Sequence, residues 1–285
     1  MVDAEERQRG AKQQEHDDSV ADVVRPDAFV LHEVIRKEGD EELQRHAGAL
    51  LLSALAAGLT MGFSLIVPGV LKAHLPQAPW TVLVTGMGYA TGFLIVVLGR
   101  QQLFTENTLT PILPLLHDRT LKTLGRVGRL WAIVLVGNII ATALIAAVLA
   151  HTDAFEPDVR KAFAEISHHA IAAPFTTTLI KAVFAGWLIA LMVWMLPATG
   201  SAAPFVVVLM TGLVSMCGLA HIVAGSVDTF YLVFTGEASI ADYVSRFFVP
   251  TLLGNVFGGT ALVAVLNYGQ VAPQVEEEKA GGKAG

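Results

Sequence analysis

Charged residues are scarce in this chain. Only 15% of its 285 residues are Asp, Glu, Lys or Arg, whereas 53% are hydrophobic, and this balance excludes an ordinary soluble globular protein. Residues 182–227 contain no Asp, Glu, Lys or Arg at all, and a soluble domain cannot bury an uncharged stretch of this length. The composition therefore predicts a protein of the lipid bilayer.

Cysteine and the common catalytic motifs are also nearly absent. The single cysteine, Cys217, excludes a disulfide framework and a cysteine metal site. The sequence has no His-Glu-x-x-His and no Gly-x-Ser-x-Gly, so we expect no metal, no cofactor and no enzymatic activity. A net charge of −6 argues against nucleic acid as a partner, and the lack of an Asn-Pro-Ala triplet argues against a true aquaporin.

Apolar stretches long enough to cross a membrane are what the sequence does contain. A helix needs about 20 residues to span about 30 Å of hydrocarbon, and six stretches meet this length. We therefore predict an all-α membrane protein with six transmembrane helices. They are residues 49–71, 80–99, 130–150, 170–196, 204–233 and 247–268.

The distribution of Lys and Arg predicts the orientation. Residues 1–48 carry seven Lys or Arg and residues 117–129 carry four, whereas the loops 73–79, 151–169 and 237–246 together carry three. Basic residues accumulate in cytoplasmic segments. Both termini are therefore expected in the cytoplasm.

Four regions follow from these boundaries. Residues 1–28 are expected to be a disordered cytoplasmic tail, and residues 29–48 an interfacial helix, with an ordinary solvated helix as the alternative. Residues 49–268 form the six-span domain. Residues 269–285 are expected to be a solvated cytoplasmic linker.

Short motifs recur in the two halves of the six-span domain. Gly137-Asn138 in the third span matches Gly254-Asn255 in the sixth, 117 residues later. Ala-Gly pairs in the first and fourth spans and Thr-Gly pairs in the second and fifth complete the correspondence. Because three spans repeat as three, the second copy enters from the opposite face, which predicts a 3+3 inverted repeat of the transporter and channel type.

The second and fifth spans are interrupted. Residues 100–111 are too polar to face lipid and too apolar for an ordinary loop, and residues 218–226 contain two glycines and a histidine. Irregular backbone at membrane depth has to be buried in protein or line a cavity. We therefore expect these broken helices, two and five, to meet at a pore.

The breaks and the sixth span carry a family resemblance. Over about residues 29–268 the sequence resembles the formate/nitrite transporter family and its YfdC-like branch. The motifs that carry the resemblance are Leu103-Phe104-Thr105, Asn107, Gly137-Asn138, His221, Pro250, Gly254-Asn255 and Gly258-Gly259. The resemblance implies an aquaporin-like fold and a homopentamer with one pore per subunit. It also implies passage of small monovalent anions such as formate or nitrite through the bacterial cytoplasmic (inner) membrane.

The same resemblance implies positions around the pore. The pore centre would be His221 and Thr105. The cytoplasmic constriction would be Leu103, Phe104 and Val193, and the periplasmic constriction would be Tyr89, Phe93 and Val214. From the residues alone, His221 is alternatively a packing histidine bonded to a freed carbonyl, Thr105 a helix cap, and the aromatic residues ordinary packing.

Further polar residues are candidates for selectivity or for bracing the breaks, because a charge inside a span is expensive and usually functional. They are Arg100, Glu106, Asn107, Lys181 and Asp228. Members of the family carry a lysine that attracts anions at the outer end of the fourth span, and an asparagine within that span. By the resemblance these positions fall near Pro174 and at Ala190 here, so Lys181 is a candidate to replace the missing lysine. The alternative is that Lys181 pairs with Glu106 or Asp228.

The estimated free-energy costs of desolvation and protonation favour proton exchange during passage. A bare anion in a dry constriction loses on the order of 10 kcal/mol of solvation, whereas protonating an acid of pKa about 4 at pH 7 costs about 4 kcal/mol. We therefore expect a channel or secondary transporter for small weak-acid anions, with proton exchange at His221. The alternatives are a neutral small-solute facilitator and a non-conducting relative with altered selectivity.

Overall fold

Helices form every regular element of the part of the chain that the structure describes. A computed structural model describes residues 26–281. The all-helical prediction is confirmed for these residues. The elements of the first half are α2 (Ala28–Gln44), α3 (Ala47–Thr60), α4 (Phe63–His74), α5 (Thr81–Leu98), η1 (Glu106–Thr108), α6 (Ile112–Asp118) and α7 (Leu121–His151). Those of the second half are α8 (Pro157–Ile171), α9 (Phe175–Met195), η2 (Leu196–Ala198), η3 (Gly200–Ala202), α10 (Ala203–Met216), α11 (Ala224–Thr235), α12 (Ile240–Asp242), η4 (Tyr243–Phe248), α13 (Val249–Phe257), η5 (Gly258–Val265) and α14 (Leu266–Gly281).

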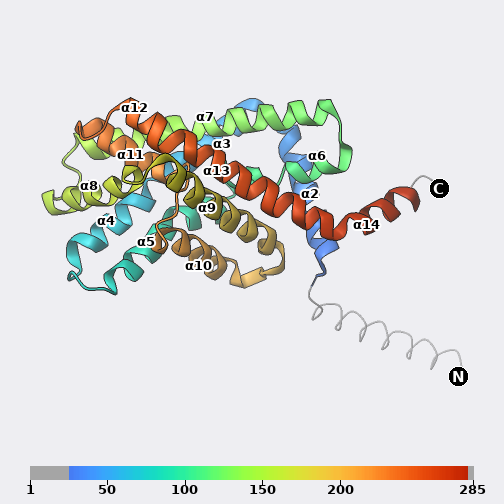
Figure 1. Ribbon diagram of the computed structural model, residues 1–285, viewed down its shortest axis with the longest axis horizontal. Coiled ribbons are helices and arrows are strands. Elements are labelled where there is room, and N and C mark those ends of the chain that lie inside the picture. Colours follow the sequence, from blue (N-terminus) through green and yellow to red (C-terminus); the bar gives the residue numbers. More distant parts are fainter. Residues whose placement is uncertain (1–25, 282–285) are drawn as a thin grey trace, which may run out of the picture.

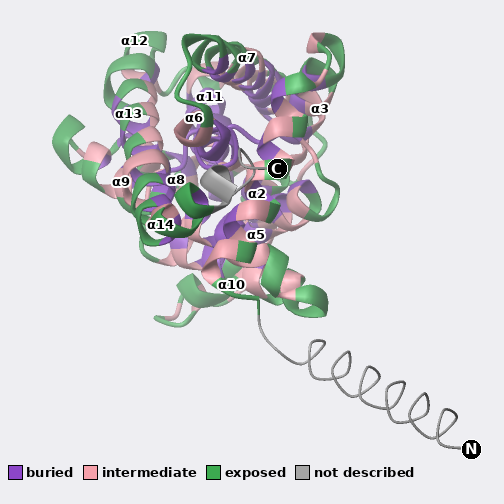
Figure 2. Ribbon diagram, turned by 90° about the vertical axis from the view of Figure 1, so that its right-hand side faces the viewer, coloured by how far each residue is buried: buried purple, intermediate pink, exposed green. Residues whose placement is uncertain are grey.

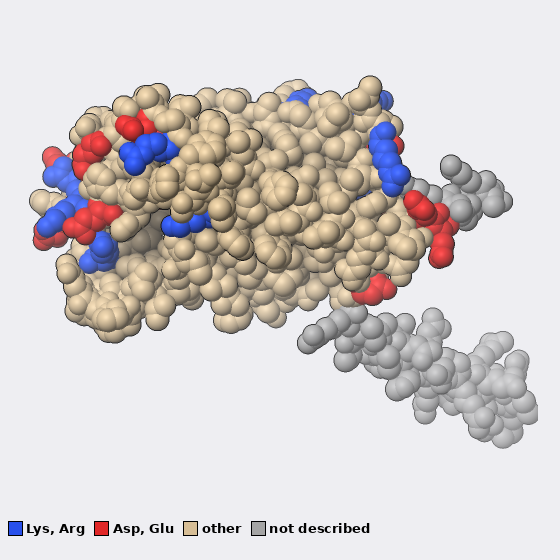
Figure 3. Space-filling model, in the orientation of Figure 1, with Lys and Arg blue, Asp and Glu red and all other residues tan. Residues whose placement is uncertain are grey.

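Several of these helices are long and apolar enough to cross a membrane. Five runs qualify by length and composition, and Gly200–Met216 is a shorter apolar helix. The five are Ala47–His74, Thr81–Leu98, Leu121–His151, Phe175–Ala198 and Ile240–Glu277. In Figure 3 the charged side chains lie at the two ends of the molecule and leave the middle of this face uncharged, as a surface in contact with lipid requires.

The helices form a bundle with two distinct ends. Figure 1 places α8 at one end and α2 with α6 at the other; these are called here the α8 end and the α2 end. At the α8 end, α8 packs on α4 and α11; at the α2 end, α2 packs on α6 and α14. Viewed from the α2 end, the buried residues lie on the inner faces of the helices (Figure 2).

Glycine allows two helix pairs to approach closely. α3 packs on α7, and α9 packs on α13. A Cβ on Gly58 would lie 2.5 Å from the Asn138 carbonyl oxygen, and a Cβ on Gly186 would lie 2.4 Å from that of Asn255. Any larger residue would push these helices apart, so each Ala-Gly motif lies where a backbone contact depends on it.

Two helices end inside the bundle. α5 ends at Leu98 and α10 ends at Met216, and neither chain segment resumes an α-helix directly. Arg100 and Gly218 then adopt left-handed backbone conformations, with φ of +50° and +59°. Glycine adopts this conformation without steric cost, whereas arginine is strained by it.

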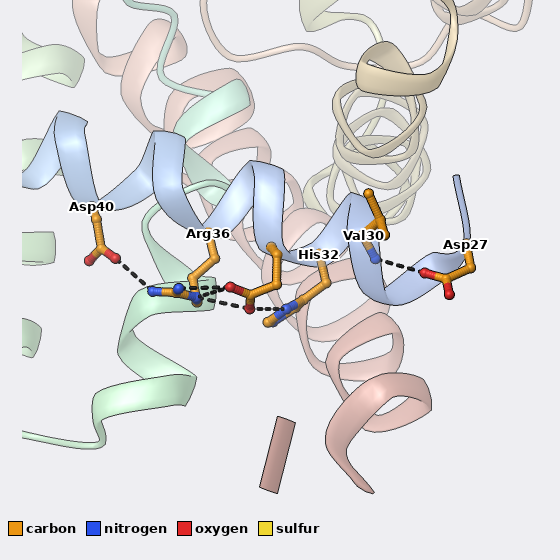
Figure 4. Close-up of polar contacts among 6 residues, drawn as sticks. Asp27, Val30, His32, Arg36 and Asp40 are labelled. Atoms are coloured by element: carbon orange, nitrogen blue, oxygen red, sulfur yellow. Dashed lines mark hydrogen bonds and ion pairs between the residues drawn. The ribbon is translucent and has the colours of Figure 1, made fainter. Parts of the chain in front are cut away.

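The first and last described helices, α2 and α14, pack on each other at the α2 end. α2 begins at the N-cap Asp27, whose side chain accepts a hydrogen bond from Val30 N–H at 2.8 Å. A chain of contacts then runs along the helix: Glu33 lies between His32 and Arg36, and Arg36 also binds Asp40 (Figure 4).

The C-terminal segment differs from the expected linker. α14 remains helical to Gly281, and Val271 and Val275 are buried in a helix that packs on α2. Two apolar residues four positions apart give this helix a packing face despite its charged composition. The tail expected at residues 1–28 lies almost wholly outside the described residues.

Candidate functional site

The two helix breaks meet at a histidine and a threonine. His221 Nε2 lies 2.7 Å from Thr105 Oγ1, although the two residues are 116 positions apart. Both side chains are buried, and the Phe93 ring lies edge-on to the imidazole with ring centroids 4.8 Å apart. The structure thus brings together the two residues predicted for the pore centre, with one predicted constriction residue against them.

Hydrogen bonds assign the proton on the neutral ring. The Ala224 backbone N–H donates to His221 Nδ1 at 3.2 Å, so Nδ1 is an acceptor and carries no proton. Nε2 then carries the proton and donates it to Thr105 Oγ1. A packing histidine would instead have bonded to a backbone carbonyl freed by the break, and the ring makes these two contacts in place of that bond. The Thr105 hydroxyl proton remains available to bind a solute.

Two asparagines hold the breaks in matching ways. Asn138 Oδ1 accepts from Phe104 N–H at 2.9 Å, and its Nδ2 donates to the Gln102 and Ala54 carbonyls. Asn255 Oδ1 likewise accepts from Ile222 N–H at 2.8 Å, and its Nδ2 donates to the Ala220 and Ala182 carbonyls. Each asparagine therefore replaces hydrogen bonds that the interrupted helix cannot make for itself.

A vestibule reaches the histidine from the α8 end. This cavity has a volume of about 980 Å³, and His221 and Tyr89 lie in its wall. Figure 3 shows the hollow at this end with basic side chains beside it. The charged and titratable residues in its wall, besides His221 and Tyr89, are Lys72, Asp158, Lys161, Glu165, His169, Lys181 and Asp228.

Lys181 lies at the deep end of the vestibule. A Cβ built on Gly218 would be 3.7 Å from Lys181 Nζ, which places the ammonium beside the break that carries His221. Neither of the predicted pairings, with Glu106 or with Asp228, occurs: within the described residues no ion pair joins Lys181 to a carboxylate. Lys181 therefore faces the cavity.

Among the described residues, no ion pair joins Arg100 to Glu106. Arg100 binds Glu38 of α2 at 2.8 Å and is 80% exposed, so it does not neutralise Glu106. Glu106 Oε1 is buried without a hydrogen-bond partner among the described residues. The alternative in which Arg100 and Glu106 brace the break by contacting each other is therefore wrong.

A second polar network lies beside the first break. Glu42 of α2 accepts from Thr110 Oγ1 at 2.7 Å and from Gln102 Nε2 at 3.1 Å. Asn107 Nδ2 donates to Gln102 Oε1 at 2.8 Å. Sequence reasoning missed Glu42 and Gln102, because nothing in the acidic run 40–42 marks the one carboxylate that turns inward.

Burial makes the Glu42 contact dependent on pH. Desolvation raises the pKa of Glu42 above its ordinary 4.5 even though two hydrogen bonds favour the ionised form. Docking of α2 is thus strongest below pH 4.5, where Glu42 is protonated whether docked or released, and weakens as the pH rises through the raised pKa.

Replacing Glu42 with Gln should remove this dependence. The amide keeps a carbonyl acceptor without a buried charge, so we expect α2 amides to exchange more slowly than in the wild type at pH 7. The measurement is hydrogen exchange at pH 5 and pH 7, corrected for the intrinsic rate. Glu41→Gln, on the exposed side of the same helix, is the control; equal protection in both variants would contradict the assignment.

The remaining predicted constriction residues are buried apolar side chains. Leu103, Phe104 and Val193 are at most 8% exposed, and Val214 is fully buried. Phe104 packs edge-on to Trp131. None of these four residues lies in the vestibule wall.

Sequence comparison identifies related proteins. The profile of the family described as formate/nitrite transporter matches residues 30–269. The inner membrane protein YfdC of Escherichia coli is 40% identical over 278 residues, which cover 98% of this chain and 88% of that protein. The formate channel BtFdhC of Bacillus thuringiensis is 23% identical over 239 residues, or 82% of this chain and 91% of the relative.

Solved structures share the fold. An FNT family ion channel superposes with a TM-score of 0.74 at 17% identity, covering 84% of this chain and 97% of that one. A pentameric formate channel with formate bound gives 0.64 at 20% identity, covering 78% and 96%. The overall arrangement of helices therefore recurs in known channel structures.

Proposed function

Because the chain belongs to the formate/nitrite transporter family, we propose that it is a channel or secondary transporter for small monovalent weak-acid anions. The observation that supports this proposal most directly is the contact between His221 and Thr105 at the end of the vestibule. It offers a solute two polar groups inside an otherwise apolar passage, which is the pattern of a selective small-molecule site.

The fold that serves this function is a 3+3 inverted repeat of six transmembrane helices, aquaporin-like, with helices two and five broken. The matched bonds of Asn138 and Asn255 support this proposal, since each asparagine joins its own break to the preceding glycine-containing helix. The helix pairs α3 with α7 and α9 with α13 are the corresponding units.

The assembly is a homopentamer in the bacterial inner membrane, with the α2 end and both termini in the cytoplasm. Two relatives support this: YfdC is an inner membrane protein, and one structural neighbour is a pentameric formate channel. In this orientation the vestibule opens outward, and the cytoplasmic ring of Leu103, Phe104 and Val193 follows the pore centre. The periplasmic ring is Tyr89, Phe93 and Val214.

Passage involves proton exchange at His221. A cationic ring would carry a proton on Nδ1, where Ala224 N–H now donates, and would lose that bond in a buried setting. The charge is therefore transient, and the ring acts mainly through Nε2–H and the Thr105 hydroxyl. These donors stabilise an anion while it shares a proton.

Lys181 attracts the anion to this point. An ammonium without a carboxylate partner in the vestibule raises the local anion concentration, and low-dielectric walls strengthen its field. We expect Lys181→Met to lower formate flux about tenfold at low ionic strength, in line with electrostatic steering. Lys161→Met, farther out and exposed, is the control; equal losses would remove the specific role of Lys181.

A neutral-solute facilitator is the second candidate, because the buried Glu106 carboxyl oxygen has no hydrogen-bond partner among the described residues and offers an uncharged solute a polar contact. Flux of formate, nitrite, acetate and hydrosulfide into liposomes tests the first function. Osmotic swelling with uncharged solutes tests the second. Swelling without anion flux would favour the facilitator.

A further inference from the structure

His221 has a neighbour with a free carboxyl group in the same cavity. His221, Gly225 and Asp228 all lie in the vestibule wall, at spacings of four and three residues. The Gly225 N–H donates to the His221 carbonyl at 2.9 Å, so helical geometry extends back to the histidine. Residues at these spacings share one helix face, and Asp228 therefore faces the cavity from the same side as His221.

The Asp228 carboxyl is left unused by the fold. Within the described residues it makes no hydrogen bond and no ion pair, and it is neither exposed nor sealed off from the cavity. The nearby hydroxyls of Ser226 and Thr229 donate to carbonyls of their own helix, at 2.6 and 2.8 Å. Glu165 differs, because Lys72 binds it at 3.3 Å.

The surroundings of Asp228 are mixed in charge. Titratable or charged groups face it across the vestibule or lie on helices packed against α11. They include Tyr89 on α5, Lys72 on α4, Lys181 on α9, Asp158, Lys161, Glu165 and His169 on α8, His151 on α7, and Tyr243 and Arg246 on η4. Acidic and basic groups thus share the vestibule with Asp228, and the open cavity gives its carboxyl group a route for protons.

The imidazole can share a proton with a permeant at Nε2, but it has no open lone pair with which to collect protons from cavity water. Its Nδ1 is occupied by Ala224 N–H, and its Nε2 faces Thr105. A group that takes up and releases protons repeatedly needs an open lone pair. Asp228 has one in the same cavity.

We propose that Asp228 is the proton relay of the vestibule. Its carboxyl O–H bond breaks, the proton forms an O–H bond on the entering anion, and the neutral acid moves toward His221. The carboxylate left behind takes a proton from cavity water, and the reverse sequence serves exit. The inference rests on the proposed weak-acid transport and adds the residue that supplies its proton.

The test is Asp228→Asn in proteoliposomes with a pH-sensitive dye inside. We expect formate flux at pH 7 to fall about a hundredfold, the lower end of the range for a general acid, and the loss to shrink as the pH is lowered and formic acid forms in water. Asp228→Glu, which keeps a carboxyl group, should restore most of the pH profile. Glu165→Gln removes a carboxylate already bound to lysine and should leave the profile unchanged.

The outcomes separate the two proposals. Formate flux in the wild type with an identical pH profile in Asp228→Asn would overturn the relay and leave the transport function intact. No weak-acid flux in the wild type would overturn the function itself. Should Asp228→Asn fail to reach the membrane, Asp228→Ser is measured instead, and a wild-type profile there is equally decisive against the relay.

Discussion

Replacing His221 with Ala should lower weak-acid flux by about 10- to 100-fold. The variant removes the Nε2–H donor, and a hydrogen bond to a charged group contributes about 1.5–3 kcal/mol. It also leaves the Ala224 N–H and Thr105 hydroxyl without their partner. The measurement is formate uptake into liposomes against protein density, with stability followed in parallel.

A second substitution separates hydrogen bonding from proton exchange. His221→Gln keeps a donor and an acceptor on a side chain of similar reach but does not titrate. If flux is retained but proton coupling is lost, the ring itself exchanges the proton. If both are lost, the ring serves mainly to position the permeant. Equal flux in His221→Ala and the wild type would remove His221 from the passage altogether.

Thr105 was predicted beside His221 from the family resemblance, at the break in the second span. Its hydroxyl meets His221 because residues 99–105 and 217–223 both leave helical geometry. Polarity and glycine content predicted these interruptions, since polar, irregular backbone at membrane depth has to be buried in protein or line a cavity. The distance between them depends on packing across 116 residues, which no local pattern encodes.

The partners of the charged residues were beyond sequence reasoning. Lys181 and Asp228 share a vestibule without pairing, and Arg100 binds Glu38 on α2. Charge spacing along one helix predicts contacts at three or four residues, but these contacts cross between helices. Glu42 shows the same limit, because its role depends on which face of α2 meets Gln102.

The C-terminal helix shows a different limit. Composition favoured a linker after Tyr268, since the segment is charged and glycine-containing. Val271 and Val275 nevertheless lie on one face and are buried at the α2 end. Two apolar residues are too few for a periodic signal, so only the presence of α2 as a partner decides the outcome.

Replacing Asn255 with Leu should produce a large loss of stability. Asn255 satisfies three backbone groups, those of Ile222, Ala220 and Ala182. Each unsatisfied group in a water-free interior costs several kcal/mol unless the chain rearranges. We expect the fifth-helix break to refold or the protein to denature, with the melting temperature in detergent lowered well beyond that of a surface variant.

Asn138→Leu is expected to have an equal effect, because its three bonds repeat those of Asn255 at the first break. Thr142→Val on α7 is the matched control, since that hydroxyl binds only the Ile139 carbonyl of its own helix. The two breaks meet at Thr105 and His221, so the double variant should be less destabilised than the sum of the single ones. Full additivity would mean that the breaks are held independently, and an Asn138 variant as stable as Thr142→Val would contradict their equivalence.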